Sequence, residues 1–126
     1  MVALDSSSII AFLEGESGGD VEVVEWAFEH SQALLPPVVL CELLSDPKPS
    51  EDLRLLFKSL PLLGISSGYW ERTGRLRARV LSRGRCARLA DSLIAQSCID
   101  HSVALVTRDQ DFRNFAAEGR LDLFFE

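Results

Sequence analysis

The stretch 88-RLADSLIAQSCIDHSVALVTRDQDF-112 joins an apolar helix pattern to a short apolar strand pattern. Acidic residues flank both elements: Asp91 opens the helix, and Asp109 and Asp111 follow the strand. A carboxylate is costly to bury without a partner. Acids on either side of the best core-forming segment of the chain therefore point to a function beyond folding.

On either side of this stretch, short apolar runs alternate with helical patterns. Strands are expected at residues 2–5, 33–35, 62–65, 103–107 and 122–125, and helices at 9–14, 21–30, 38–45, 50–60, 67–83 and 89–101, with a short turn or helix at 109–117. This alternation predicts parallel strands with helices on both faces of the sheet. The expected fold is α/β, a three-layer sandwich around a mostly parallel sheet of four to five strands, as a single domain over residues 1–126.

The composition narrows the class of protein. The chain has 126 residues, 47% hydrophobic, which is enough for a core without disulfides. Its three cysteines form no CxxC pair, no secretory signal precedes the first strand, and no apolar run could span a bilayer. These features favour a cytoplasmic protein with free thiols and no membrane partner. The net charge of −6 argues against a general nucleic-acid binder.

Five acids are expected near the carboxyl edge of the sheet, where open parallel sheets bind their ligands. Asp5 follows the first strand, Asp109 and Asp111 follow the strand at 103–107, and Asp91 and Glu42 lie on neighbouring helices. Each has an ordinary structural alternative. Asp5 could cap a helix, Asp91 could favour a helix dipole, Asp109 and Asp111 could form an Asx turn, and Glu42 could face solvent.

If these carboxylates converge, they need a counter-charge. Two unit charges 4 Å apart repel by about 4 kcal/mol at an effective dielectric near 20. Mg²⁺ or Mn²⁺ with oxygen ligands resolves this repulsion, and such a site suits hydrolysis of a phosphodiester. The chain offers no His/Cys cluster for zinc, and His30 and His101 lie at expected helix ends rather than in an acid–base pair.

Arginines concentrate just before this segment: seven of the 13 basic residues lie from 72 to 88. Four of them recur every three or four residues and form a stripe on the expected helix, namely Arg72, Arg75, Arg79 and Arg83, and Arg77, Arg85 and Arg88 add to it. The stripe could be an ordinary solvated helix face. It could also contact RNA phosphates, with Arg72, Arg75, Arg79, Arg83 and Arg88 as the candidate contacts.

Three segments resemble the PIN-domain ribonucleases of the VapC toxin type: 4-LDSSSIIAFL-13, 39-VLCELL-44 and 90-ADSLIAQSCIDHSVALVTRDQDF-112. The resemblance covers essentially the whole chain and implies a PIN-like fold. It implies Mg²⁺- or Mn²⁺-dependent cleavage of RNA, a cognate antitoxin that blocks the acidic groove, and a homodimer. One departure is 42-ELLSDPK-48, where the family often has a glycine.

The same resemblance implies residue roles. The matching positions are Asp5, Glu42, Asp91 and Asp109 as catalytic and metal-site acids, Asp111 as a fifth acid, Ser7 as a small polar residue near the metal, and Thr107 as a supporting hydroxyl. Two alternatives stay open: a non-catalytic PIN-like binding module, and a PIN nuclease of RNA processing that is not a toxin. A phosphotransfer receiver domain is disfavoured, because the chain lacks an Asp-Asp pair after its first strand.

Overall fold

The computed structural model describes residues 1–48 and 50–124. Within them, four parallel strands form one sheet in the order β2-β1-β3-β4. The strands are β1 (Val2–Leu4), β2 (Ala33–Leu34), β3 (Ala104–Val106) and β4 (Leu123–Phe124). The predicted parallel α/β sheet is therefore confirmed, although the end of the strand expected at 122–125 lies outside the described residues.

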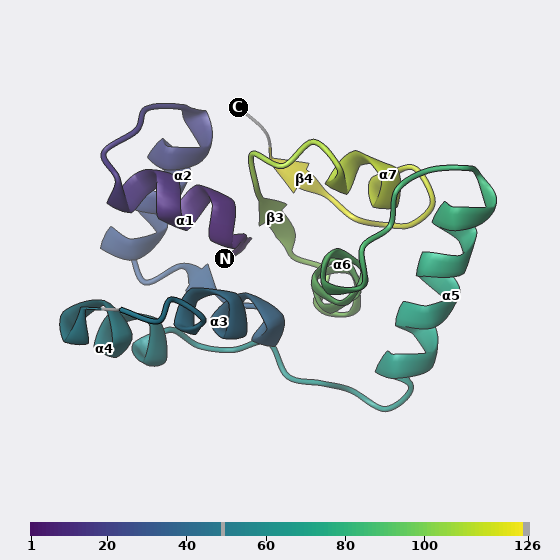
Figure 1. Cartoon of the computed structure of the whole chain (residues 1–126), viewed down its shortest axis with the longest axis horizontal. Helices are drawn as coiled ribbons and strands as arrows, with labels where there is room; N and C mark the ends of the chain where they lie inside the picture. The colour runs from purple at the N-terminus through teal and green to yellow at the C-terminus, as the bar shows by residue number, and fades with distance from the viewer. Residues whose placement is uncertain (49, 125–126) are drawn as a thin grey trace.

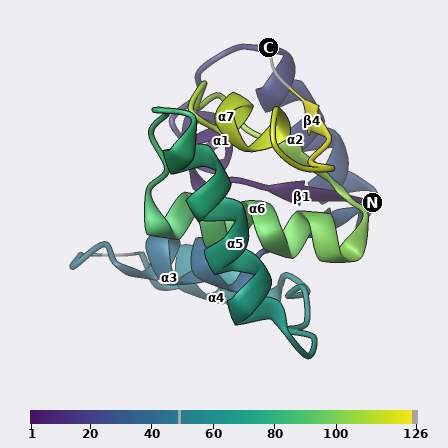
Figure 2. The ribbon, with the colours of Figure 1, turned by 90° about the vertical axis from the view of Figure 1, so that its right-hand side faces the viewer.

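Helices cover both faces of this sheet. They are α1 (Ser6–Leu13), α2 (Gly19–Glu29), α3 (Pro37–Leu44), α4 (Glu51–Ser59), α5 (Tyr69–Ser82), α6 (Leu89–His101) and α7 (Phe112–Ala116). Figure 1 shows α1 and α2 together on the left and α5 at the right-hand end, and α5 packs against α6. In Figure 2, β1 runs between α1 and α2 on one side and α6 on the other, which gives the expected three layers.

The strand expected at 62–65 does not form, and this prediction is wrong. Only one bridge remains, between Leu35 and Leu62, held by the Leu35 amide donating to the Pro61 carbonyl and the Leu63 amide donating to the Leu35 carbonyl, both at 2.9 Å. The neighbouring chain continues into Pro36, which has no N–H to extend a ladder. Pairing therefore stops after one step.

The first helix begins earlier than expected, at Ser6 rather than residue 9. The serines do not cap it: Ser8 is buried and donates to the Asp20 carboxylate at 2.8 Å. Asp5 occupies the capping position in an extended conformation but makes no side-chain capping bond. Its carboxylate is thus available to other groups, which removes the helix cap as an explanation for this acid.

The core lies on both faces of the sheet, and α6 runs through one half of it. Leu4, Leu105, Ile94 and Phe112 are fully buried there. α6 contacts α3, α5, α7 and β3, so it is surrounded on several sides, which explains why its polar residues Ser92, Gln96 and Ser97 are buried as well as its apolar ones. No helix in the described part of the chain is long and apolar enough to cross a membrane.

Candidate metal centre

Asp5 is fixed where the carboxyl ends of β1 and β3 meet. Its amide donates to the Val106 carbonyl at 2.9 Å, which ties the two strand ends together. Its Oδ2 accepts hydrogen bonds from Ser7 Oγ and Thr107 Oγ1, both at 2.7 Å. Burial raises the pKa of this carboxyl, while the two hydroxyl donors oppose the rise. Ser7 and Thr107 therefore hold Asp5 in one orientation.

Asp91, Asp109 and Asp111 converge from α6 and the loop after β3. Each offers an oxygen atom, and the three atoms lie within 4.8 Å of one another. The Asp111 amide donates to Asp109 Oδ1 at 2.9 Å, which is the Asx turn considered as an ordinary alternative. The Asp109 amide donates to Thr107 Oγ1 at 3.0 Å. The turn and the cluster coexist, because the turn places the Asp109 and Asp111 side chains beside Asp91.

Glu42 lies at the exposed rim of the cluster, on α3. Ser6 Oγ donates to its Oε1 at 3.2 Å. Partial burial raises the pKa of Glu42, and the charges of Asp5 and Asp109 raise it further. Glu42 is therefore accessible to solvent and close enough to Asp5 and Asp109 to be affected by their charges, but it is not among the three acids whose oxygens lie within 4.8 Å of one another. Its role in the site stays a prediction.

Asp91 is the acid of the cluster whose ionised form its surroundings disfavour most clearly. Burial raises its pKa to about 6, and the charges of Asp109, Asp5 and Glu42 act in the same direction. Among residues 1–48 and 50–124, its Oδ2 is the one buried side-chain oxygen or nitrogen with no hydrogen-bond partner. A buried acceptor without a partner costs about 1–3 kcal/mol, and more if it is charged. A cation bound here would remove that cost.

The donor set fits a hard divalent cation. Every ligand candidate is a carboxylate oxygen, which Mg²⁺ and Mn²⁺ prefer, and no His or Cys belongs to the group found in the described residues. Asp91 contributes the oxygen without a partner, and Asp109 and Asp111 contribute oxygens that are partly exposed. The candidate ligand atoms are thus of the kind that a hard divalent cation binds.

Acidic residues pair with some of the arginines of the stripe. Arg72 forms an ion pair with Asp100 at 2.7 Å, and Arg83 lies 3.5 Å from Glu118. Arg88 is exposed at the start of α6, and its charge opposes the rise in the pKa of Asp91. Of the five arginines proposed to contact RNA, only Arg88 is thus seen to act on the acidic cluster.

Sequence reasoning missed a partly buried ion pair that positions the loop after β3. Arg108 donates through Nε to Asp20 Oδ2 at 2.8 Å and through a terminal nitrogen to Asp20 Oδ1 at 3.0 Å. Asp20 is fully buried, and the Arg108 guanidinium lowers the pKa of its carboxyl. The pair fastens α2 to the residue before Asp109. Because Asp20 falls at the end of 15-GESGGD-20, the sequence suggests only a loop.

We expect Asp20→Asn to destabilise the protein by about 1–3 kcal/mol, because a charged hydrogen-bond acceptor is lost beneath Arg108. The free energy of unfolding from urea titration measures this effect. Glu22→Gln is the matched control, since Glu22 is exposed in the same first turn of α2. Equal stability of the two variants would contradict a positioning role for Asp20.

The chain was compared with known protein families and solved structures. The PIN-domain family model matches residues 2–118, a range that includes all five acids. A chain in the structure of VapBC2 from Rickettsia felis, bound to a promoter DNA fragment, is similar at a TM-score of 0.73 and 20% identity, covering 100% of this chain and 99% of that one. A chain of VapBC-1 from nontypeable Haemophilus influenzae gives 0.74 and 16%, covering 99% and 98%.

VapBC-5 from Mycobacterium tuberculosis, a member of the VapBC family of toxin–antitoxin systems, gives a TM-score of 0.68 at 18% identity, covering 99% of this chain and 98% of that one. At these identities the likeness shows a shared fold. A comparison with curated protein sequences found no match. The family model covers nearly the whole chain, and the chain therefore belongs to the PIN-domain family.

Proposed function

We propose that the protein is a Mg²⁺- or Mn²⁺-dependent endoribonuclease and the toxin of a type II toxin–antitoxin pair. The observation that carries the proposal is the buried Asp91 Oδ2 with no partner among the described residues, beside the oxygens of Asp109 and Asp111. PIN-domain proteins are generally nucleases, which agrees with an all-carboxylate site. A structural site would not need an accessible acid at its rim, and Glu42 is one.

The residues divide into three roles in this proposal. Asp91, Asp109 and Asp111 hold the cation together with Asp5, whose orientation Ser7 and Thr107 fix. The bound cation would activate water and stabilise the leaving oxygen of the phosphodiester.

Glu42 is the acid placed to accept a proton from the attacking water. It is exposed, and partial burial together with the charges of Asp5 and Asp109 raises its pKa above the ordinary value, which makes it a better proton acceptor. Its hydrogen bond from Ser6 Oγ, at 3.2 Å, keeps the carboxylate at the rim of the cluster.

The antitoxin is the proposed protein partner. A cleft of about 440 Å³ lies between α1, α3 and α4, and Glu42 is on its edge. Its lining is largely apolar and includes Ile10, Leu13, Leu53 and Phe57. An apolar antitoxin segment seated there would end beside the acidic cluster, so it could block RNA access. The similar structures are of VapBC and FitAB proteins, which supports a partner of this kind. The homodimer and the cytoplasmic location stay predictions.

RNA cleavage by the purified chain, free of antitoxin, tests the proposal. We expect cleavage of total RNA with Mg²⁺ or Mn²⁺, none with EDTA, and none from Asp5→Asn, because this variant alters the acid that both strand ends position. Circular dichroism of the variant checks that it folds. Full activity of Asp5→Asn would sink the assignment.

The two alternatives give different results in the same assay. A non-catalytic binding module would yield no fragments although the protein is folded and binds metal. An RNA-processing PIN nuclease would cleave RNA in the same metal-dependent way, but its expression in cells without a partner would not stop their growth. Growth arrest that Asp5→Asn relieves is the result expected of a toxin.

A further inference from the structure

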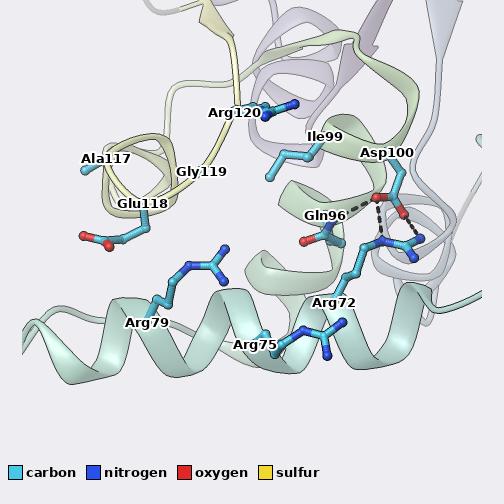
Figure 3. Close-up of a pocket in the computed structure, with 10 residues that line it drawn as sticks. All are labelled: Arg72, Arg75, Arg79, Gln96, Ile99, Asp100, Ala117, Glu118, Gly119 and Arg120. Carbon is cyan, nitrogen blue, oxygen red and sulfur yellow. Dashed lines mark hydrogen bonds and ion pairs between the residues drawn. The ribbon is translucent and has the colours of Figure 1, made fainter.

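A second cleft, with a basic lining, lies between α5, α6 and the chain after α7. Its volume is about 600 Å³, larger than that of the cleft beside Glu42. In Figure 3, Arg75 and Arg79 lie on α5 along one wall of this cleft and Arg120 lies on the opposite wall, with Ile99 and Gln96 of α6 between them. The cleft brings together arginines that are 45 positions apart in sequence, which the linear stripe did not indicate.

The charges in this cleft do not cancel. Asp100, one of its two acids, is paired with Arg72 at 2.7 Å, and Glu118, the other, lies 3.5 Å from Arg83 and 3.8 Å from Arg85. That leaves three guanidiniums, those of Arg75, Arg79 and Arg120, with no ion pair or hydrogen bond to any described residue.

Three like charges around one cleft repel each other, and the protein as a whole carries −6. A local positive field of this kind attracts an anion although the net charge would repel it. The planar, forked donors of arginine match the oxygens of a phosphate group.

The basic cleft is separate from the acidic cluster. Both include residues of α6, but Asp91 lies in its first turn and Asp100 in its last, about 13 Å apart along the axis at 1.5 Å per residue. At about 100° per residue, Gln96 and Asp100 also face more than a third of a turn away from Asp91. A ligand in the cleft therefore does not touch the acids, and a long ligand is needed to reach both.

We propose that this cleft binds backbone phosphates of single-stranded RNA at a distance from the cleaved bond. Arg75 and Arg79 are one helical turn apart, about 6 Å along α5, so they address neighbouring phosphates rather than one. Arg120 contacts the strand from the other wall, and the apolar side chain of Ile99 forms the floor between them. This inference rests on the proposed ribonuclease function, whose substrate the cleft would hold.

The test is RNA binding in EDTA, where metal-dependent cleavage does not interfere. A fluorescein-labelled single-stranded RNA is titrated with the full chain and with the triple variant Arg75→Gln, Arg79→Gln, Arg120→Gln, over a range of salt concentrations. For single strands each phosphate contact contributes about 0.7 to the slope of log K against log salt, so we expect the slope to fall by about 2. The affinity at low salt falls with it.

The control removes the same charge elsewhere: Lys48→Gln, Arg54→Gln, Lys58→Gln, at and before α4 on the other side of the molecule. We expect its RNA affinity and salt slope to stay near those of the wild type. The proposal would be overturned if both triple variants kept the RNA affinity and salt slope of the wild type. It would also be overturned if both variants lost RNA affinity to the same extent. The melting temperature of each variant confirms that it folds.

Two further arms separate the alternatives. Replacing the three arginines with lysine keeps the charge but not the fork, and we expect it to restore the slope and part of the affinity. Mononucleotide binding that the glutamine variant loses, without any change in RNA affinity, would assign the cleft to a small ligand and overturn the RNA proposal. If the wild type does not cleave RNA in Mg²⁺, but the glutamine variant still shows the lower salt slope of RNA binding, the proposed nuclease activity is rejected and the proposed RNA site in the cleft is retained.

Discussion

We expect Asp91→Asn to lower the proposed metal-dependent RNA cleavage on the order of 10²–10³-fold and to make the metal-free protein more stable. The loss follows because a bound cation supplies several kcal/mol of charge stabilisation in the transition state, at 1.36 kcal/mol per tenfold in rate. The gain follows because Asp91 is buried beside three other acids and its Oδ2 has no partner among the described residues. Asparagine removes the charge at nearly the same volume.

Opposite effects on activity and stability distinguish this account from simple misfolding. Cleavage rates at saturating RNA give the first effect, and thermal unfolding in EDTA gives the second. Asp52→Asn is the control, since Asp52 is exposed in the first turn of α4, outside the cluster. An Asp91→Asn protein that cleaves normally, or that is less stable than the wild type without metal, would contradict the assignment.

We expect the metal-free protein to lose about 3 kcal/mol of stability as the pH rises from about 4 to about 7. Asp91 has its pKa raised from 3.8 to about 6 in the folded state, so between these values the folded chain binds more protons than the unfolded one. Stability then falls with rising pH, by 1.36 kcal/mol per pKa unit. Asp5 and Glu42, whose pKa values are also raised, act in the same direction.

The acids that form ion pairs do not cancel this fall in stability between pH 4 and pH 7. The pKa values of Asp20 and Asp100 are lowered by their arginine partners, so the stability they contribute is lost only below about pH 4. Urea unfolding in EDTA at several pH values measures the slope. We expect Asp91→Asn to flatten it, and Mg²⁺ to remove it in the wild type, because a bound cation favours the ionised carboxylates. If the free energy of unfolding of the metal-free wild type rises from pH 4 to pH 7, the claim that the ionised acids of the cluster destabilise the fold is contradicted.

The sheet and the acidic edge could be predicted because they depend on local patterns and one topological rule. Short apolar runs such as 103–107 predict buried strands, and parallel strands place their carboxyl ends at one edge. Asp5 and Asp109 follow β1 and β3, which are neighbours in the sheet, so their proximity follows from strand order alone. Asp91 could be included because it opens the helix that leads into the strand at 103–107.

The remaining features depend on contacts between distant segments. Arg108 and Asp20 are 88 positions apart, and no local pattern pairs them. The run 62–65 has the composition of a strand, but its neighbour enters Pro36 after one bridge. The arginine stripe looks uniform in sequence, yet acids from α6 and the segment after α7 engage some of its members and leave Arg75 and Arg79 without partners among the described residues.

Direct titration of Mn²⁺ into the metal-free protein tests the central claim, that the acidic cluster holds a divalent cation. Calorimetry at neutral pH should show saturable binding to the wild type and to Asp52→Asn. The same titration of Asp91→Asn should show Mn²⁺ binding that is lost or at least tenfold weaker, because a proposed ligand of the cation has been removed. A tenfold change in affinity corresponds to about 1.4 kcal/mol. Mn²⁺ binding of equal strength to folded Asp91→Asn, or none to the wild type, would contradict the account.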